Sequence, residues 1–199
     1  LNTGIVLDIE SQVNNQRSYG ADVISRINFT IENEDGLEIL KNSIVNQLNN
    51  MIELLCTRNN IKELNIYDTA IVGNTTMIHI LLGLPCKYIA ISPYVPIITK
   101  AFEVEASEIG INTGGMINLI PGISSYVGSD ITAGIVSSGI LDSEKYSLLL
   151  DLGTNGEIAL GNKDEIITCS TAAGPAFEGA NIKYGIGGVN GAISKIDLS

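Results

Sequence analysis

The stretch Leu148-Leu149-Leu150-Asp151-Leu152-Gly153-Thr154-Asn155-Gly156-Glu157 decides the fold that we expect for this chain. Its apolar residues predict a buried strand, which delivers an aspartate to an exposed turn. The two glycines have no Cβ, so backbone N–H groups can close on an anion there. The turn is therefore a candidate phosphate-binding hairpin, although Asn-Gly is also common in ordinary hairpins. We expect five of its residues to contact phosphate: Gly153, Thr154, Asn155, Gly156 and Glu157.

Asp151 lies where the predicted strand ends and the turn begins. A carboxylate in this position can hold Mg²⁺ through water and so offset the charge of phosphate groups. We therefore expect Asp151 to be a metal-binding and catalytic residue.

A second candidate anion site follows the hairpin, in Ala172-Ala173-Gly174-Pro175-Ala176-Phe177-Glu178-Gly179-Ala180. A helix that starts at Gly174-Pro175 leaves free N–H groups pointing outward, which favours an anion. Glu178 could orient a water molecule or a metal ion. The alternative is an ordinary helix start with an acid in its first turn.

Gly128-Ser129-Asp130 precedes a predicted helix, lined with small residues, over 130–140. Asp130 could bind a metal-held water or act as a base, and we include it among the catalytic and metal candidates. The alternative is that Asp130 only caps the helix. The small residues on this helix predict close approach to another element.

Gly73-Asn74-Thr75-Thr76 lies at the carboxyl end of a predicted strand and opens a helix. Ligands in α/β proteins bind at such positions, so Gly73, Asn74 and Thr75 are candidate cofactor-binding residues. Capping of the helix by Asn74 or Thr75 is the alternative. His79, one turn further on, is expected to be a packed or partner-facing residue.

The remaining chain alternates strands and helices, which predicts a parallel or mixed α/β sheet. Apolar residues spaced as in a helix run from Leu37 to about Cys56, with Asn33 or Asp35 as cap. Further expected helices follow a bend within 17–27 and cover 77–82, and 84–113 is expected to be irregular. Strands are expected at 5–10, 64–72, 117–120, 146–151, 157–160 and 165–170, and residues 1–6 weakly echo 160–167.

Composition excludes several classes of function. The 199 residues carry a net charge of −11, which disfavours binding to nucleic acid or to an anionic membrane surface. Three scattered cysteines and one histidine provide no zinc or iron–sulfur site and fit a reducing cytoplasm. The most apolar region, 77–98, is interrupted by Gly83, Pro85, Pro93 and Pro96 and predicts no membrane span.

The hairpin motif at Asp151–Glu157 resembles the second phosphate loop of the actin-like ATPase superfamily, which includes acetate and sugar kinases, heat-shock chaperones and actin. This resemblance implies an α/β, ribonuclease-H-like fold with two lobes and nucleotide between them. It also implies that the helix at 130–140 joins the lobes. The resemblance assigns 1–142 to a first lobe with its connecting helix, and 143–199 to the start of a second lobe.

A narrower resemblance covers almost the whole chain. The ordered set of motifs is similar to that of the reductive activators of corrinoid proteins: Tyr19–Ile27, Val72–Met77, Pro93–Pro96, Gly128–Asp130, Asp151–Glu157 and Ala173–Ala180. The family implies a protein that uses ATP and Mg²⁺ to help return cobalt(II) corrinoid, held on a partner protein, to cobalt(I). Electrons would pass through a [2Fe–2S] centre in a separate amino-terminal domain.

We read the chain as a piece of a longer protein, because it opens on Leu1 without methionine and lacks the family's cysteines and first phosphate loop. Both lobes are then incomplete, and the piece alone is expected to bind ATP weakly. The expected partner is a corrinoid-carrying protein, and a homodimer is kept as an option. Two alternatives remain: a small-molecule phosphotransferase of the same superfamily, and a non-catalytic adaptor.

Overall fold

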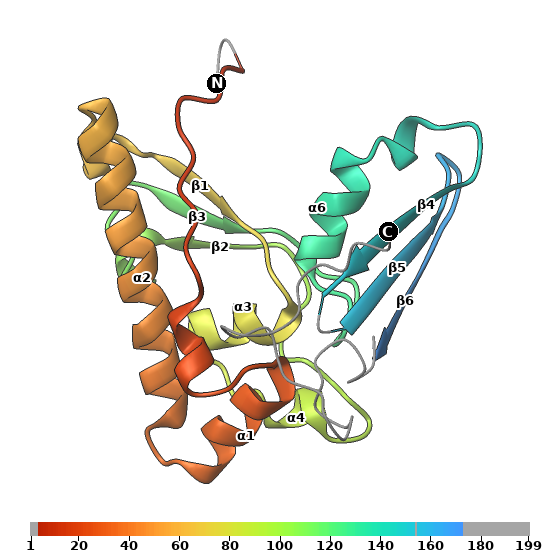
Figure 1. Cartoon of the computed structure of the whole chain (residues 1–199), viewed down its shortest axis with the longest axis horizontal. Helices are drawn as coiled ribbons and strands as arrows, with labels where there is room; N and C mark the ends of the chain where they lie inside the picture. The colour runs from red at the N-terminus through yellow and green to blue at the C-terminus, as the bar shows by residue number, and fades with distance from the viewer. Residues whose placement is uncertain (1–3, 154, 173–199) are drawn as a thin grey trace, which may run out of the picture. The chain divides into compact units, whose positions relative to one another are not determined.

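The computed structural model describes residues 4–153 and 155–172. The chain divides into two compact units, Leu1–Ala133 (unit 1) and Gly134–Ser199 (unit 2), which are described separately (Figure 1). The lobe boundary expected at 142/143 stays a prediction. No helix in the described part of the chain is long and apolar enough to cross a membrane.

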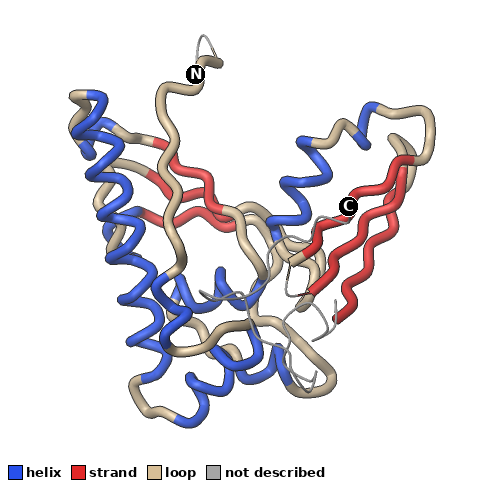
Figure 2. Tube along the Cα trace, viewed as in Figure 1, coloured by secondary structure: helices blue, strands red, loops and turns tan. Residues whose placement is uncertain are grey.

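Unit 1 contains a mixed sheet of three strands, in the order β1-β3-β2 (Figure 2). β1 (Asp68–Ile71) runs parallel to β3 (Met116–Leu119), and β2 (Phe102–Glu105) pairs with β3 in the antiparallel direction. The sequence predicted β1 and β3 correctly in place, although β1 begins later than expected. Residues 63–65 form a 3-10 turn instead of the start of that strand.

The expectation that 84–113 is irregular was wrong, because this region contains α4 (Lys87–Ala90), β2 and α5 (Ala106–Ile109). Each of these elements has four residues. A segment of that length shows little more than one turn of helical periodicity, or two alternations of a strand. Only Val104 of β2 is buried, so the strand has no apolar run to reveal it.

The longest helix of unit 1, α2 (Gly36–Asn59), confirms the helix expected from Leu37. Asp35 occupies the N-cap position but makes no side-chain capping bond, and Asn33 instead ends α1 (Val23–Glu32). At the other end Asn60 takes the left-handed conformation, with its N–H bonded to the carbonyls of Cys56 and Thr57. This is the usual C-terminal stop of a helix, with asparagine in place of glycine.

Two hydrophobic cores meet at α2 and at α3 (Thr75–Leu82). In one core Val45 of α2 and Leu81 of α3 pack with Ile117 of the sheet. In the other, Leu40 and Ile80 from the same two helices pack with residues of α1 and α4. α3 is therefore buried on two sides and lies at the centre of unit 1 (Figure 1).

The motif at 19–27 has a structural explanation. Asp22 and Ser25 form a capping box at the start of α1, and Arg26 Nε donates to the Gly20 carbonyl at 3.0 Å. A Cβ on Gly20 would lie 2.7 Å from the backbone nitrogen of Arg26, so the turn requires glycine. Arg26 Nη1 also contacts Met77 Sδ at 3.0 Å, which links α1 to α3.

The strand expected at 5–10 was wrong. Residues 4–14 form no helix or strand, and Ile5, Val6, Leu7 and Ile9 are all exposed. An apolar run becomes a strand only if a neighbouring strand accepts its backbone bonds, and no described strand pairs with it. The structure therefore gives no support to the sequence echo between 1–6 and 160–167.

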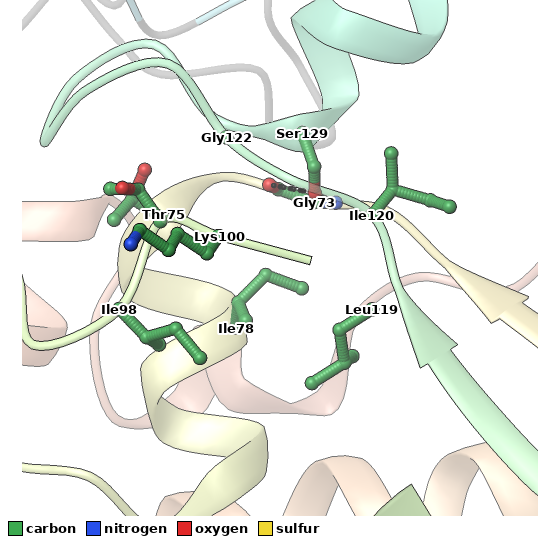
Figure 3. Close-up of a pocket in the computed structure, with 10 residues that line it drawn as sticks. Gly73, Thr75, Ile78, Ile98, Lys100, Leu119, Ile120, Gly122 and Ser129 are labelled. Carbon is green, nitrogen blue, oxygen red and sulfur yellow. Dashed lines mark hydrogen bonds between the residues drawn. The ribbon is translucent and has the colours of Figure 1, made fainter. Parts of the chain in front are cut away.

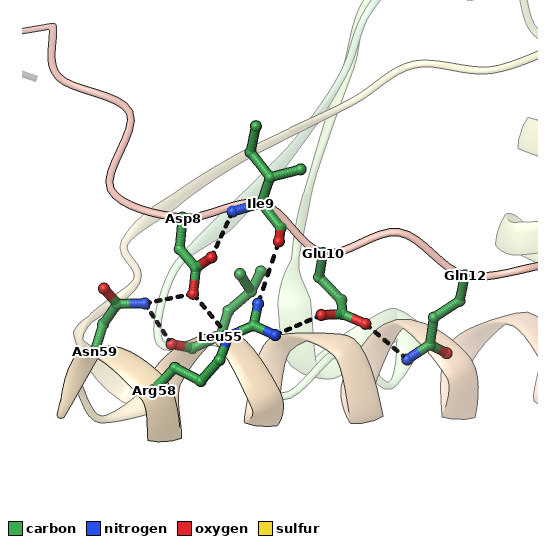
Figure 4. A network of polar contacts seen from close by, with 7 residues as sticks. All are labelled: Asp8, Ile9, Glu10, Gln12, Leu55, Arg58 and Asn59. Atoms are coloured by element: carbon green, nitrogen blue, oxygen red, sulfur yellow. Dashed lines mark hydrogen bonds and ion pairs between the residues drawn. The ribbon is translucent and has the colours of Figure 1, made fainter.

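Arg58, in the last turn of α2, holds this amino-terminal segment instead (Figure 4). Its Nε lies 2.8 Å from Asp8 Oδ2 and its Nη1 lies 2.7 Å from Glu10 Oε2. Hydrogen bonding to the Arg58 guanidinium lowers the pKa of both carboxyl groups. The pairs are open to solvent, so they position the segment more than they stabilise the fold.

α6 (Ser129–Ser137) begins in unit 1 and ends in unit 2, where a 3-10 turn (Ile140–Asp142) follows. The sheet of unit 2 is an antiparallel meander in the order β4-β5-β6. Its strands are β4 (Ser147–Leu152), β5 (Asn155–Gly161) and β6 (Ile166–Ala172). All three expected strands are therefore confirmed in place. α6 ends earlier than Ile140, because Gly139 is left-handed at φ 74°.

Candidate functional site

The hairpin between β4 and β5 carries the expected phosphate-binding residues of unit 2. Leu152 pairs with Gly156, and the Gly153 N–H donates to the Asn155 carbonyl at 2.9 Å. The Gly153 amide is therefore used by the turn itself. Gly153 is not left-handed, and among the described residues beyond its chain neighbours, a Cβ on it would meet no atom closer than 3.7 Å. The described residues therefore do not require glycine at 153. The space that a side chain would fill is open to a ligand. Thr154 lies outside the described residues.

A row of polar side chains, called the acid row, crosses this sheet beside the turn. Asp151 of β4 lies directly opposite Glu157 of β5, which in turn lies opposite Ser170 of β6. Ser170 Oγ donates to Glu157 Oε1 at 3.3 Å. Side chains opposite each other in an antiparallel pair have Cβ atoms about 4.5–5.5 Å apart, and like charges there repel. A cation beside Asp151 and Glu157 would offset that repulsion.

The donor set of this row fits Mg²⁺, which proteins bind through one or two carboxylates and several waters. No group of three His, Cys, Asp or Glu suited to a metal ion occurs among the residues that the structure describes. The row would thus hold the ion loosely and leave most of its coordination to water and phosphate. Pairing across the hairpin is what brings Glu157 to Asp151, and the sequence motif already contained both residues.

The expectation of a close-packed helix is confirmed within unit 2. A Cβ on Gly134 of α6 would lie 3.0 Å from Leu149 Cδ2 of β4. Leu149 shares a strand face with Asp151, because residues two apart on a strand point the same way. A small residue on α6 therefore lets the helix approach the face of the sheet that carries the acid row.

In unit 1 the structure brings together two motifs that lie 56 residues apart in the sequence. Ser129 Oγ accepts from the Gly73 N–H at 3.0 Å and donates to the Gly73 carbonyl at 3.1 Å (Figure 3). A Cβ on Gly128 would lie 2.6 Å from the Gly73 oxygen, so this contact needs glycine. Gly73–Thr75 and Gly128–Asp130 therefore form one site, where α3 and α6 begin.

A small cavity of about 20 Å³ lies beside this contact (Figure 3). This volume admits roughly one water molecule and no phosphoryl group, so a larger ligand would bind at its rim. Its lining combines backbone near the two helix starts with apolar side chains and one lysine: Gly73, Thr75, Ile78, Ile98, Thr99, Lys100, Leu119, Ile120, Gly122 and Ser129. Helix starts carry partial positive charge, and Lys100 adds a full one.

Lys100 was missed from the sequence. It lies in the segment that was expected to be irregular, and no motif accompanies it. A single lysine in a loop has no spacing from which a site could be predicted. The hydrogen bond from the Gly122 N–H to the Thr99 carbonyl, at 2.8 Å, is one of the contacts that bring this segment to the site.

Asn74 and Thr75 have structural roles at the start of α3. Asn74 caps the helix by accepting from the Thr76 N–H at 3.0 Å, as the alternative interpretation expected. Thr75 Oγ1 donates to the Ser124 carbonyl at 2.7 Å. Asp130 lies inside the first turn of α6 and accepts from the Ile131 N–H at 2.9 Å. Their roles toward a ligand stay predictions, as do those of Gly174, Pro175 and Glu178, which lie outside the described residues.

His79 is a packed residue, as expected. It is fully buried, and its Nδ1 lies 2.7 Å from the Thr75 carbonyl while its Nε2 accepts from the Ile97 N–H at 3.0 Å. These partners require a neutral ring with the proton on Nδ1. Burial lowers the pKa of His79, which favours the same neutral form.

Comparisons with known proteins cover most of the chain and agree with one another. The family model described as the RACo middle region matches residues 1–143, and the model of the C-terminal domain of RACo, the ASKHA domain, matches residues 145–199. A solved structure titled reductive activator for corrinoid, iron-sulfur protein superposes with a TM-score of 0.84 at 40% identity. The match covers 93% of this chain and 30% of that one.

Two curated relatives are similar in sequence. The corrinoid activation enzyme RamQ of Eubacterium limosum is 36% identical over 198 residues, which is 98% of this chain and 33% of that protein. The [Co(II) methylated amine-specific corrinoid protein] reductase of Methanosarcina barkeri is 42% identical over 76 residues, which is 38% of this chain and 14% of that protein. This chain spans at most about a third of these relatives.

The predicted fold class is confirmed by these matches, since the ASKHA domain has the actin-like ATPase fold. The chain belongs to the RACo family, with the family's middle region matched by residues 1–143 and its C-terminal ASKHA domain matched by residues 145–199.

Proposed function

We propose that this chain is the nucleotide-binding part of an ATP-dependent reductive activator, which helps return cobalt(II) corrinoid on a partner protein to cobalt(I). One observation carries the proposal: 93% of the chain superposes on a solved reductive activator at a TM-score of 0.84. The 36% identity to a corrinoid activation enzyme over nearly the whole chain supports the same function.

The hairpin of unit 2 would bind the phosphate groups of ATP in this function. Asp151 and Glu157, opposite each other on β4 and β5, would hold Mg²⁺ through water. Bound Mg²⁺ would supply charge neutralisation at the phosphate oxygens. Gly153 leaves space for phosphate to approach the turn, since no described atom beyond its chain neighbours lies closer than 3.7 Å to its Cβ position.

The site of unit 1 would contribute backbone and one cation. The first turns of α3 and α6 and the Lys100 ammonium attract anionic groups at the rim of the cavity. Asp130, in the first turn of α6, would act on a metal-bound water. Gly174, Pro175 and Glu178 are proposed to add a second anion-binding turn.

The remaining assignments follow the family. We place the two lobes at 1–142 and 143–199, and the [2Fe–2S] centre in a separate amino-terminal domain. Electrons would reach the cobalt from that centre, and nucleotide binding and hydrolysis would change the conformation that docks the corrinoid protein. We propose that the protein works in the cytoplasm, where its free cysteines would stay reduced.

The test uses the full-length protein that contains this chain. It is mixed with a corrinoid iron–sulfur protein held in the cobalt(II) state, a low-potential one-electron reductant and Mg²⁺, with or without ATP. We expect the cobalt(I) absorbance to appear at a rate that depends on ATP. Equal rates with and without ATP would contradict the proposal. ATP turnover stimulated by a small metabolite, and not by the corrinoid protein, would favour a phosphotransferase; no nucleotide binding would favour an adaptor.

A further inference from the structure

Two loops of unit 1, which are bonded to each other and to α3, expose a group of apolar side chains. The loops are 84–100, which includes α4, and 120–128, which precedes α6 (Figure 1). Six apolar side chains on them are each 47–60% exposed, and together they are called the loop face: Tyr88, Ile91, Tyr94, Val95, Ile97 and Ile123. Exposed apolar residues scattered singly need no explanation, but a group of this size on two adjoining loops is typical of a binding surface.

The two loops are fastened to each other. The rings of Tyr94 and Tyr126 meet edge to face with centroids 5.8 Å apart, and Ser125 Oγ donates to the Tyr94 carbonyl. The Tyr126 hydroxyl donates to the Ile89 carbonyl at 3.0 Å. These bonds hold the loop face in one arrangement before any partner arrives, which reduces the entropy lost on binding.

Both loops are also fastened to α3. The His79 ring accepts from the Ile97 N–H at 3.0 Å, and Thr75 Oγ1 donates to the Ser124 carbonyl at 2.7 Å. Both anchoring side chains are buried. The loop face is therefore supported by the same helix that starts at the candidate site of unit 1.

The segments that build the loop face differ in charge from the rest of the chain. Between Asp68 and Glu103, and again between Glu108 and Asp130, the sequence contains no acid. The same segments contain Lys87 and Lys100, and neither lysine forms an ion pair with any residue that the structure describes. A chain with a net charge of −11 thus concentrates its acids elsewhere and leaves these loops positive.

We infer that the loop face is a docking surface for an acidic protein surface with an apolar centre, carried by the corrinoid-binding partner. The inference rests on the proposed function, which supplies the partner. Apolar contacts at the centre and opposite charges at the rim are the usual composition of a transient interface. A second copy of this chain fits less well, because a two-fold contact would bring together two copies of the same positive surface, with Lys87 and Lys100 on both sides.

The test compares two double variants in the full-length protein. Lys87→Glu with Tyr88→Asp reverses a charge and removes apolar area on the loop face. Lys62→Glu with Tyr67→Asp makes the same changes at an exposed lysine and an exposed tyrosine away from it. Calorimetry measures the Kd for a corrinoid iron–sulfur protein and for a methylated amine-specific corrinoid protein at two salt concentrations. ATP binding and cobalt(I) formation are followed in parallel.

We expect the first variant to bind the partner at least about tenfold more weakly, with a Kd that depends less on salt. The second variant stays within about twofold of wild type, and both variants keep wild-type ATP binding. Normal partner binding by the first variant overturns the inference while leaving the proposed function intact. Loss of a dimer in the first variant, seen by light scattering with partner binding unchanged, overturns it in favour of self-association. A wild-type protein that neither binds nor reduces either corrinoid protein overturns both.

Discussion

The two three-stranded sheets of this chain use their apolar residues differently. In the sheet β1-β3-β2, Val104, Ile117 and Leu119 are all buried within one core with α2 and α3. In the sheet β4-β5-β6, one face carries the acid row and the other carries apolar residues that are 44–78% exposed: Leu148, Leu150, Leu152, Leu160 and Ile167.

This difference suggests that the first sheet serves mainly the stability of the fold and the second sheet mainly the binding of nucleotide. Burial of apolar area is what holds a domain together, so unit 1 has its own source of stability. The acid row of unit 2 needs only the register of an antiparallel hairpin, in which Asp151 lies opposite Glu157. We therefore expect substitutions in the first sheet to act mainly on folding, and substitutions near the hairpin to act mainly on nucleotide.

The largest effect is expected from Gly115→Ala, directly before β3. Its new Cβ would lie 1.9 Å from the Tyr67 carbonyl oxygen, so the backbone that pairs β1 with β3 has to move. We expect the free energy of unfolding to fall by about 3 kcal/mol or more. Denaturant unfolding followed by circular dichroism measures this.

The matched change in unit 2 is Gly153→Ala. Its new Cβ would lie no closer than 3.7 Å to any described atom beyond its chain neighbours, and the backbone at 153 is not left-handed. Its stability should stay within about 0.5 kcal/mol of wild type, while ATP affinity falls because the methyl group obstructs the approach of phosphate. Equal losses of stability in the two alanine variants would break the comparison between the sheets.

Asp151→Asn should have the second largest effect, and on activity alone. The substitution keeps the shape and removes the charge that would hold Mg²⁺-bound water, so ATP turnover should fall about 100-fold or more. Stability should stay equal or rise slightly, because the like charge opposite Glu157 disappears. Steady-state ATP turnover and thermal unfolding are measured on the same sample, and unchanged turnover would show that Asp151 is misassigned.

His79→Phe tests the support of unit 1. Phenylalanine keeps the packing but leaves the Ile97 N–H and the Thr75 carbonyl without their ring partners, at a cost of about 1–3 kcal/mol. His79→Gln, which can keep one of these bonds, should lose less. Denaturant unfolding at pH 7.5 ranks the three proteins, and a His79→Phe variant as stable as wild type would show that these bonds contribute nothing.

The stability difference between wild type and His79→Phe is expected to depend on pH. Burial lowers the pKa of His79, so the folded protein binds the proton less readily than the unfolded chain. The stability from neutral His79 is complete above the unfolded pKa of about 6.5. This contribution decreases as pH falls below about 6.5, and it reaches a constant value once the pH is below the lowered pKa of the folded state. The gap between wild type and His79→Phe should therefore shrink between pH 7.5 and 5.5, and a constant gap would contradict the lowered pKa of His79.

The smallest effect is expected from Leu150→Ser in β4. Leu150 is 50% exposed, in contrast to the fully buried Ile117 of β3. Serine at 150 should change the free energy of unfolding by no more than about 0.5 kcal/mol, whereas Ile117→Ala should cost about 2–5 kcal/mol. A large loss at 150 would show that the exposed leucine face is covered in solution, and that the two sheets are more alike than the structure indicates.

The sequence predicted the long and strongly patterned elements. α2 shows several turns of helical spacing. The run of leucines before Asp151 predicts β4 without any information about the strands that pair with it. It misplaced elements that depend on partners. Residues 5–10 have a strand's composition but pair with no strand that the structure describes, and β2 is a strand that pairs with β3.

The candidate site divides in the same way. Asp151 and the Gly73 turn could be found because each stands next to a recognisable strand end. The contact of Ser129 with Gly73, and the position of Lys100 beside it, depend on how distant loops pack. Local sequence does not contain that information.

α3 was described as the helix that begins at the candidate site of unit 1 and anchors the loop face through Thr75 and His79. If both proposed ligands bind there, the two binding equilibria share one rigid body and are thermodynamically linked. Reciprocity then requires that any factor by which nucleotide tightens partner docking is the factor by which the partner tightens nucleotide binding. The corrinoid protein would therefore act as an effector of the proposed ATPase as well as its proposed client, with α3 as the element that couples the two sites.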